Sequence, residues 1–337
     1  MTNRYETVKK DLIGSPRKWL VTGAAGFIGS HLVESLLSLD QAVVGLDNFS
    51  TGKIENIIDV QTGVGSEKAS RLKMIEDDIR DPAACRKACE GVDIVLHQAA
   101  LGSVPRSIKD PASTHNTNVD GFFNMILAAK DGGIKRFVYA SSSSVYGDEP
   151  NLPKREERIG KPLSPYALSK LINEQIAQIF ARTYGFRSIG LRYFNVFGPR
   201  QDPEGPYAAV IPRWFDALSR GESPVIFGDG KTSRDFCFVA NAVQANILAA
   251  TTDNNDAWNQ AYNVACGKQT TLEELFRMIR DAVSELHPEA AKIEPKYEDF
   301  RPGDIRHSLA DVGKAEKLLG YEILFEVQKG LPVSRPF

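Results

Sequence analysis

The sequence predicts an α/β protein in which helices cover both faces of a parallel sheet and a smaller α/β lobe follows. Apolar, strand-like runs alternate with helical patterns between residues 17 and 140, which is typical of parallel strands joined by crossover helices. A loop with three glycines follows the first run. After about Pro199 the alternation ends, and Gly and Pro residues separate shorter elements. These observations divide the chain into a sheet domain over residues 1–198 and a lobe over residues 199–337, with segments around 235–265 expected to return to the sheet.

The predicted strands are short, continuous and rich in Val, Ile and Leu, as expected of strands that are covered on both faces. A helix is expected to begin after Pro165. The expected strands are Trp19–Thr22, Ala42–Asp47, Leu72–Ile75, Ile94–His97, Arg136–Ala140 and Ser188–Arg192.

Composition and charge exclude several classes of protein. The chain has 337 residues, of which 42% are hydrophobic, and this is enough for a sizeable core. The 41 Lys and Arg residues nearly balance the 43 Asp and Glu residues, so no global field favours nucleic acid or an anionic membrane. No apolar stretch approaches the roughly 18 residues of a membrane span, and the polar N-terminal segment does not resemble a signal peptide. We therefore expect a cytoplasmic protein without a nucleic-acid or membrane partner.

The four cysteines are too few and too scattered for a disulfide framework, and no Cys/His cluster suggests a metal site. Cys85 and Cys89 are four residues apart on an expected helix and are expected to pack in the core.

The glycine loop has the spacing Gly-x-x-Gly-x-x-Gly at Gly23, Gly26 and Gly29, between an apolar strand and an apolar-periodic helix. Gly23 allows a tight turn, Gly26 lets backbone N–H groups approach a pyrophosphate, and Gly29 lets the helix pack closely on the strand. The N-terminus of the helix then faces the diphosphate charge. The loop therefore predicts a dinucleotide site in a Rossmann-type doubly wound parallel sheet, with the smaller C-terminal α/β lobe left for the substrate.

Asp47 ends the second predicted strand, 21 residues after Gly26. A carboxylate at this position can accept hydrogen bonds from the adenosine ribose and would repel a 2′-phosphate. The following residues, 48–52, include no Arg or Lys, so NAD is favoured over NADP. Asp78 and Ile79, after the third strand, are expected near the adenine edge.

Tyr166 and Lys170 lie four residues apart in a helical pattern and share one face of the helix. A nearby ammonium favours phenolate over phenol and is expected to lower the tyrosine pKa from about 10 toward neutrality. Tyr166 is therefore the expected base. The run Ser141–Ser144 follows the fifth strand at its carboxyl end, where open parallel sheets bind ligands, so a hydroxyl there can share a substrate proton with Tyr166.

Together these motifs resemble the extended short-chain dehydrogenase/reductase family, and within it the UDP-hexose and UDP-N-acetylhexosamine 4-epimerases. The resemblance covers nearly the whole chain. It rests on the glycine loop, Asp47-Asn48, Asp78-Ile79, His97-Gln98-Ala99-Ala100, Asn118, the serine run, Tyr166/Lys170, Tyr193-Phe194-Asn195, residues 233–236 and residues 301–304.

The resemblance implies a role for each matching residue. Tyr166 would take the proton of the sugar 4-hydroxyl while C4 gives a hydride to NAD, Ser142 would bond that oxygen with Ser143 or Ser144 assisting, and Lys170 would hold the nicotinamide ribose. NAD would stay tightly bound, because the net oxidation is zero. The implied NAD contacts are Gly23, Gly26, Phe27, Ile28, Gly29, Asp47, Asn48, Ser50, Thr51, Gly52, Asp78, Ile79, Gln98, Ala99, Ala100, Asn118, Tyr166, Lys170, Tyr193 and Val196. The implied UDP-sugar contacts are Gly102, Ser103, Ser142, Ser143, Tyr166, Asn195, Ala209, Val210, Ile226, Phe227, Arg234, Arg301, Asp304 and Ser308.

Sister reactions of the family remain open alternatives, because dehydratases, decarboxylases and reductases share the NAD loop and the Tyr/Lys pair. Family dehydratases carry an Asp-Glu pair where this chain has Ser143-Ser144, and no glutamate lies between Ala140 and Tyr146 to serve decarboxylation. The serine run therefore favours epimerisation. A protein that only binds NAD is the other alternative, and the retained Tyr166 and Lys170 count against it.

The segments Ala100–Ser107 and Ala208–Pro212 resemble epimerases of bacterial surface-polysaccharide pathways, such as O-antigen synthesis, that prefer N-acetylated substrates. Strict UDP-glucose enzymes place a bulky tyrosine where this chain has Ser308, and a serine leaves room for an acetamido group. UDP-GlcNAc and UDP-GalNAc are the expected substrates, while UDP-Glc, UDP-Gal and the uronate forms stay possible. The family also implies a homodimer through Thr114–Lys130 and Pro165–Tyr184.

Two further expectations concern charged residues. His97 follows a predicted buried strand and is expected to be a packed, hydrogen-bonded ring rather than a catalyst. The charged run Lys154–Arg158 is expected to be a solvated loop.

Overall fold

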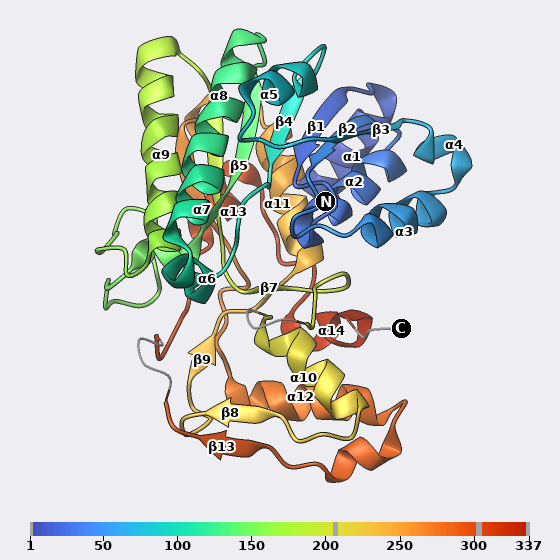
Figure 1. The fold of residues 1–337 in the computed structure, drawn as a ribbon, viewed down its shortest axis with the longest axis vertical. Coiled ribbons are helices and arrows are strands. Elements are labelled where there is room, and N and C mark those ends of the chain that lie inside the picture. Colours follow the sequence, from blue (N-terminus) through green and yellow to red (C-terminus); the bar gives the residue numbers. More distant parts are fainter. Residues whose placement is uncertain (1–2, 205–207, 301–304, 335–337) are drawn as a thin grey trace.

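The computed structural model describes residues 3–204, 208–300 and 305–334, and its main feature is a seven-stranded sheet (Figure 1). The strand order is β11-β6-β5-β4-β1-β2-β3, and every neighbouring pair is parallel. The predicted fold class is confirmed. These strands are β1 Lys18–Thr22, β2 Ala42–Asp47, β3 Leu72–Glu76, β4 Ile94–His97, β5 Arg136–Ser142, β6 Ser188–Tyr193 and β11 Gln260–Val264.

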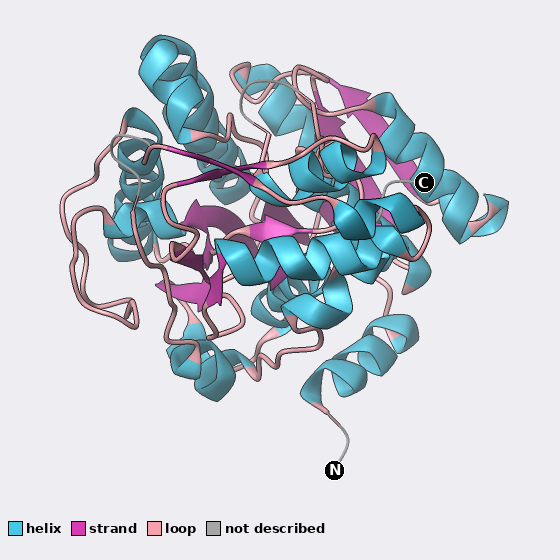
Figure 2. Ribbon diagram, turned by 90° about the horizontal axis from the view of Figure 1, so that it is seen from below, coloured by secondary structure: helices cyan, strands magenta, loops and turns pink. Residues whose placement is uncertain are grey.

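Alternate residues of the strands supply two separate cores, one on each face of the sheet. Trp19 and Val21 of β1 belong to the core shared with α1, α2, α11 and α13, whereas Leu20 belongs to the core shared with α5, α8 and α9. Figure 2 shows helices on both sides of the strands. The helices are α1 Arg4–Gly14, α2 Phe27–Ser38, α3 Ile54–Val64, α4 Ser66–Ala69, α5 Pro82–Ala88, α6 Val104–Lys109, α7 Pro111–His115, α8 Gly121–Asp131, α9 Pro165–Tyr184, α11 Val239–Thr251 and α13 Gly313–Leu319.

A smaller lobe lies below the sheet in Figure 1 and has its own core, which includes Trp214, Phe215, Ile226 and Phe276. Its helix α12 begins with a capping box, in which Thr271 and Glu274 bond to each other's backbone. The chain returns from this lobe to the sheet domain, since α11 packs on the sheet and β11 extends its edge. The remaining elements are β7 Val196–Phe197, α10 Val210–Ser219, β8 Val225–Phe227, β9 Ser233–Arg234, β10 Cys237–Phe238, β12 Thr270–Thr271, α12 Leu272–Ser284, β13 Lys296–Glu298 and α14 Val327–Gly330.

The expectation of a solvated loop at residues 154–158 is confirmed for Arg155, Glu157 and Arg158, which are exposed, and is wrong for Lys154 and Glu156. Lys154 and Glu156 are buried, with 7% and 9% exposure. The segment packs on β11, because Asn263 donates its backbone N–H to Glu156 Oε1 at 2.8 Å and its Nδ2 to the Lys154 carbonyl at 2.9 Å. A charged sequence does not reveal such contacts with a distant strand.

The cysteines behave as expected. All four are unpaired and buried, and burial raises the pKa of Cys85 and Cys89 to about 12. Among the residues that the structure describes, no group of His, Cys, Asp or Glu side chains could hold a metal ion. Within the same residues, no helix has the length and apolar character needed to span a membrane.

Candidate active site

The glycine loop joins β1 to α2 at the carboxyl edge of the sheet. Gly23 has a φ of 67°, and its N–H donates to the Leu46 carbonyl at 2.8 Å. A Cβ at Gly29 would lie 1.9 Å from the Gly23 carbonyl oxygen, so only glycine allows α2 to approach the loop this closely. Gly26 is the N-cap of α2 and makes no side-chain capping bond, which leaves the first N–H groups of the helix for a ligand. These features fit a diphosphate.

Asp47 lies at the carboxyl end of β2 with 8% exposure. Its carboxylate accepts the N–H of Ala25 at 2.9 Å and the N–H of Phe49 at 2.8 Å. Burial raises its pKa above the ordinary value, against the effect of these hydrogen bonds. A Cβ at Gly52 would lie 2.9 Å from both carboxylate oxygens, so the loop after β2 folds directly over this group.

Asp78 lies beside this loop and binds Asn48, whose Nδ2 donates to Asp78 Oδ2 at 2.6 Å. Arg80 also pairs with Asp78 at 2.7 Å, and its hydrogen bond lowers the pKa of that carboxyl. The Ile79 side chain is buried in the core against α5 and α8, so only its backbone could reach a cofactor.

Residues after β4 are fixed by two hydrogen-bond networks. Thr22 Oγ1 lies 2.8 Å from His97 Nδ1 and accepts the N–H of Ala99 at 3.2 Å. Burial, together with Lys170, lowers the pKa of His97 to about 3, so the ring is neutral at physiological pH. His97 is thus the packed, hydrogen-bonded ring that the sequence predicted.

The second network joins Gln98, Tyr193 and Asn246. Tyr193 donates to Gln98 Oε1 at 3.0 Å, Gln98 Nε2 donates to Asn246 Oδ1 at 3.0 Å, and Asn246 Nδ2 donates to Tyr193 at 2.7 Å. This closed triangle fixes the ends of β4 and β6 against α11. No motif in the sequence points to Asn246, because it lies in a distant helix.

Asn118 lies in a π-helical turn, Asn116–Asp120, between α7 and α8. Its side chain accepts the N–H of Leu101 at 2.7 Å and donates to Ser169 Oγ at 3.1 Å. Asn118 therefore connects the loop after β4 to α9. Such π-helical turns occur frequently at functional sites.

Tyr166, Lys170 and Ser142 come together where α9 begins and β5 ends. The Ser142 side chain lies close enough to the Tyr166 hydroxyl to lower its pKa. Ser142 Oγ also accepts from Ser144 Oγ at 2.9 Å, and Lys170 Nζ donates to the Ala140 carbonyl at 2.9 Å. Burial lowers the pKa of Lys170 to about 8.

The expected lowering of the Tyr166 pKa is wrong for the protein alone. Burial raises the pKa of Tyr166, and the hydrogen bond with Ser142 offsets it only in part. The sequence could show that an ammonium lies one helical turn away, but the loss of hydration depends on packing.

The expected UDP-sugar contacts come from several separate elements of the sheet domain and the lobe. Ser103 caps α6 with a strained φ of 96°, and Ala209 caps α10. Ser308 donates its N–H to the Ser233 carbonyl at 3.1 Å, beside Arg234, which donates to the same oxygen at 3.0 Å. The side chain of Ile226 is fully buried, so only its backbone could meet a substrate. Arg301 and Asp304 lie outside the described residues.

A segment after β7 is bonded both to α2 and to Lys53, which follows the loop after β2. The Pro199 carbonyl lies 3.0 Å from His31 Nε2, and Arg200 pairs with Glu34 at 2.8 Å, both on α2. Asp202 pairs with Lys53 at 3.1 Å, next to the loop that covers Asp47. We call residues 199–202 the strap.

A parallel sheet in the order 3-2-1-4-5-6 with a glycine loop at its switch point defines a dinucleotide-binding protein of the Rossmann class. The chain belongs to the NAD dependent epimerase/dehydratase family, whose model matches residues 19–265. NAD is the cofactor of this family, and the family inferred from the motifs is confirmed.

Three relatives illustrate the similarity. The UDP-glucose 4-epimerase of Mycolicibacterium smegmatis is 35% identical and matches over 94% of this chain and 97% of its own. The UDP-N-acetylglucosamine 4-epimerase of Methanobrevibacter ruminantium, solved with UDP-N-acetylmuramic acid, is 41% identical with a TM-score of 0.84, covering 95% of this chain and 97% of that one. The UDP-glucose 4-epimerase of Thermus thermophilus, solved with NAD, is 31% identical with a TM-score of 0.80. The match covers 94% of this chain and 97% of that one.

Proposed function

We propose that this protein is an NAD-dependent 4-epimerase that interconverts UDP-GlcNAc and UDP-GalNAc. The observation that carries the proposal is the position of Tyr166 and Lys170 on α9 against the serine run, where Lys170 Nζ donates to the Ala140 carbonyl at 2.9 Å, at the same sheet edge as the glycine loop. The named activities of the similar proteins support it, because they include 4-epimerases of UDP-glucose and UDP-N-acetylglucosamine.

The chain's residues would act on the sugar 4-hydroxyl. Tyr166 accepts its proton, and Ser142 holds the same oxygen by a hydrogen bond. Lys170 holds the nicotinamide ribose and supplies positive charge next to the phenol. NAD held at the glycine loop and Asp47 would supply a reversible hydride acceptor for C4, which is the chemistry that inversion through a 4-keto sugar requires.

We assign NAD to the sheet domain, over residues 1–198 with α11 and β11, and the UDP-sugar to the lobe over residues 199–337. The free N–H groups at the start of α2 and the carboxylate of Asp47 support the first assignment. The strap supports tight retention of NAD, because it is bonded to both α2 and the loop after β2.

The surroundings of the serine run favour epimerisation over elimination or decarboxylation, which need an acid or base near the sugar. One carboxylate, that of Glu174, does reach the run. Both of its oxygens are engaged, Oε1 by Ser141 and Arg192 and Oε2 by Arg192. Glu174 is therefore not free to move a substrate proton.

We further propose a homodimer formed through α8 and α9. These helices expose Phe123, Leu168, Ile179 and Tyr184, whose exposures lie between 43% and 56%. Apolar side chains gathered on neighbouring helices are typical of a surface that a partner covers. The four free, buried cysteines are consistent with a reducing compartment, so we place the enzyme in the cytoplasm, in a pathway that supplies surface polysaccharide.

Tyr166→Phe tests the proposal. We expect turnover of UDP-GlcNAc to fall by roughly 10²-fold or more, because the proton acceptor is lost, while bound NAD remains. The matched control is Tyr262→Phe, which removes a buried hydroxyl that donates to the Ala257 carbonyl at 2.7 Å and should leave turnover unchanged. Full activity of Tyr166→Phe would rule out the assignment.

A further inference from the structure

A buried ion pair lies behind the serine run. The side chains of Glu174 and Arg192 are only 5% and 3% exposed. Arg192 binds both carboxylate oxygens, with Nε 2.9 Å from Oε1 and Nη2 2.7 Å from Oε2. Burial works against the charge of Arg192, but the hydrogen bonds and charge of Glu174 outweigh it and raise its pKa.

This pair is bonded to the first residue of the serine run and to Tyr146, two residues after its last. Ser141 Oγ donates to Glu174 Oε1 at 2.6 Å, and Arg192 Nη1 donates to the Tyr146 hydroxyl at 3.1 Å. Tyr146 ends the 3-10 turn Ser143–Tyr146 and donates to Asn263 at 2.6 Å. Ser142, Ser143 and Ser144 lie between these two attachments.

The same pair is attached to the helix that carries Tyr166. Tyr166, Lys170 and Glu174 follow one another at intervals of four residues, so they lie along one face of α9. Lys170 donates to the Ala140 carbonyl, one residue before the Ser141 that donates to Glu174. Helix α9 and strand β5 are therefore joined by hydrogen bonds at two consecutive residues of the strand, Ala140 and Ser141.

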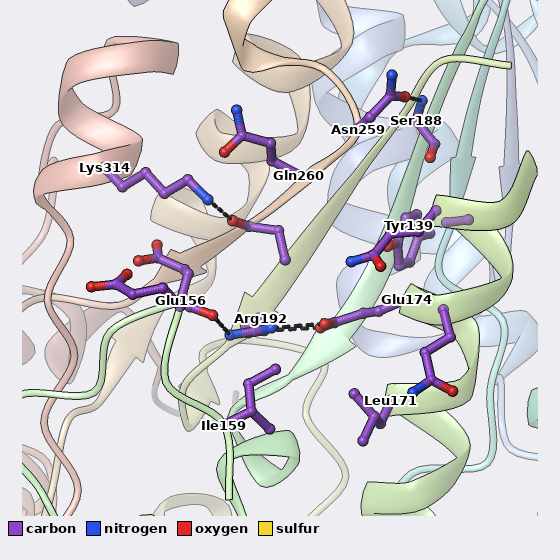
Figure 3. A pocket seen from close by; sticks show the side chains of 15 residues that line it. Tyr139, Glu156, Ile159, Leu171, Glu174, Ser188, Arg192, Asn259, Gln260 and Lys314 are labelled. Atoms are coloured by element: carbon purple, nitrogen blue, oxygen red, sulfur yellow. Dashed lines mark hydrogen bonds and ion pairs between the residues drawn. The ribbon is translucent and has the colours of Figure 1, made fainter. Parts of the chain in front are cut away.

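Figure 3 shows how the surrounding protein holds this pair. Arg192 lies between Glu174 and Glu156, and its Nη1 also donates to the Glu156 carbonyl at 3.0 Å. The pair borders a pocket of about 430 Å³, also lined by Gln260 and Lys314. Lys314 Nζ is held by the Ala261 carbonyl at 2.9 Å, so it does not compete with Arg192 for Glu174.

We propose that Glu174 and Arg192 are positioning residues that hold Ser142 against the Tyr166 hydroxyl during epimerisation. This inference rests on the proposed function, since it assigns Ser142 and Tyr166 to the reaction. Neither charged side chain needs to touch the sugar. The ion pair affects the rate through position alone, because a displacement of reacting groups by about 1 Å can lower the rate roughly 10²-fold.

Ser141→Ala tests the inference, because it removes the hydrogen bond between β5 and Glu174 and keeps the ion pair between Glu174 and Arg192. In the holoenzyme we expect kcat to fall about tenfold, the effect of one lost charge-assisted hydrogen bond, with KM and bound NAD unchanged. Ser141→Thr keeps the hydroxyl and should restore kcat. Ser334→Ala, the matched control, removes a buried hydroxyl that donates to the Gly330 carbonyl at 2.7 Å and should leave kcat unchanged.

A second measurement does not depend on turnover. The ultraviolet titration of Tyr166, taken as the difference from Tyr166→Phe, should move to higher pH in Ser141→Ala, because a displaced Ser142 no longer favours the phenolate. Wild-type kcat and an unmoved titration in Ser141→Ala would overturn the positioning role, as would a rise in KM alone. A wild-type protein without epimerase activity would instead overturn the proposed function, while the titration still tests the positioning role.

Discussion

At the scale of single residues, burial and the neighbouring Ser142 have opposite effects on the pKa of Tyr166, the proposed base. Burial raises the pKa of Tyr166, and the hydrogen bond with Ser142 lowers it. A base works in its deprotonated form, so the rate should rise as the pH rises through the pKa of Tyr166. Removing the hydrogen bond should move that rise to higher pH.

Ser142→Ala is expected to lower kcat roughly ten- to a hundredfold near neutrality and to move the rising limb of the pH–rate profile upward. The measurement is kcat between mildly acidic and alkaline pH. His97 cannot produce this limb, because burial and Lys170 lower its pKa to about 3. If the rising limb of Ser142→Ala lies at the same pH as that of the wild type, the role assigned to Ser142 is contradicted.

The site residues that could be predicted from the sequence are of two kinds. Some have partners close in sequence, and others lie at the end of a predicted strand. The glycines and Tyr166/Lys170 have fixed local spacings, and Asp47 is the last residue of a predicted strand. Glu174 and Arg192 were missed because their partners lie on other elements, although Glu174 continues the four-residue spacing of Tyr166 and Lys170. Burial, which decides the direction of the Tyr166 pKa, also appears only after folding.

At the scale of elements, the strands β1 to β6 were predicted to within two residues at each end, because strands buried on both faces are continuous apolar runs. The burial of Lys154 and Glu156 was missed because it depends on Asn263 of β11, which donates to the Glu156 carboxylate and to the Lys154 carbonyl. The strap was also missed, since its ion pairs join elements that are more than 100 residues apart in sequence.

We expect retention of NAD to depend on Arg200 of the strap, because Arg200 pairs with Glu34 on α2. Arg200→Gln breaks the 2.8 Å ion pair with Glu34, in which the arginine is only 14% exposed, so α2 and the strap should separate more readily. We expect several-fold less NAD per chain after dialysis, measured by absorbance of the released dinucleotide. Arg220→Gln is the control, because Arg220 is 57% exposed and pairs with Asp216 within α10. Equal NAD content in both variants would show that the strap does not retain NAD.

At the scale of the whole molecule, two hydrophobic cores pack on the two faces of the sheet, and a third lies in the lobe. The end of the regular alternation after Pro199 is the feature of the sequence that predicts a separate lobe. The sequence could not show how β11 and α11 complete the sheet domain after the chain has entered the lobe, because that return depends on long-range pairing between β11 and β6.

The apolar surface of α8 and α9 predicts a dimer in solution. Light scattering at micromolar concentration should give twice the mass of one chain. Ile179→Lys, which places a charge on that surface, should give the mass of one chain, whereas Ile13→Lys, at a similarly exposed position on α1, should not. A wild-type protein with the mass of a single chain would refute the dimer.

The central claim is that bound NAD is reduced and reoxidised within one catalytic cycle on an N-acetylated UDP-sugar. The most direct measurement is incubation of the purified protein with UDP-GlcNAc without added NAD, followed by nuclear magnetic resonance of the products. The expected product is UDP-GalNAc, or UDP-GlcNAc when the reaction starts from UDP-GalNAc. Release of carbon dioxide, a 4-keto-6-deoxy sugar, or turnover only with added NAD would contradict the central claim.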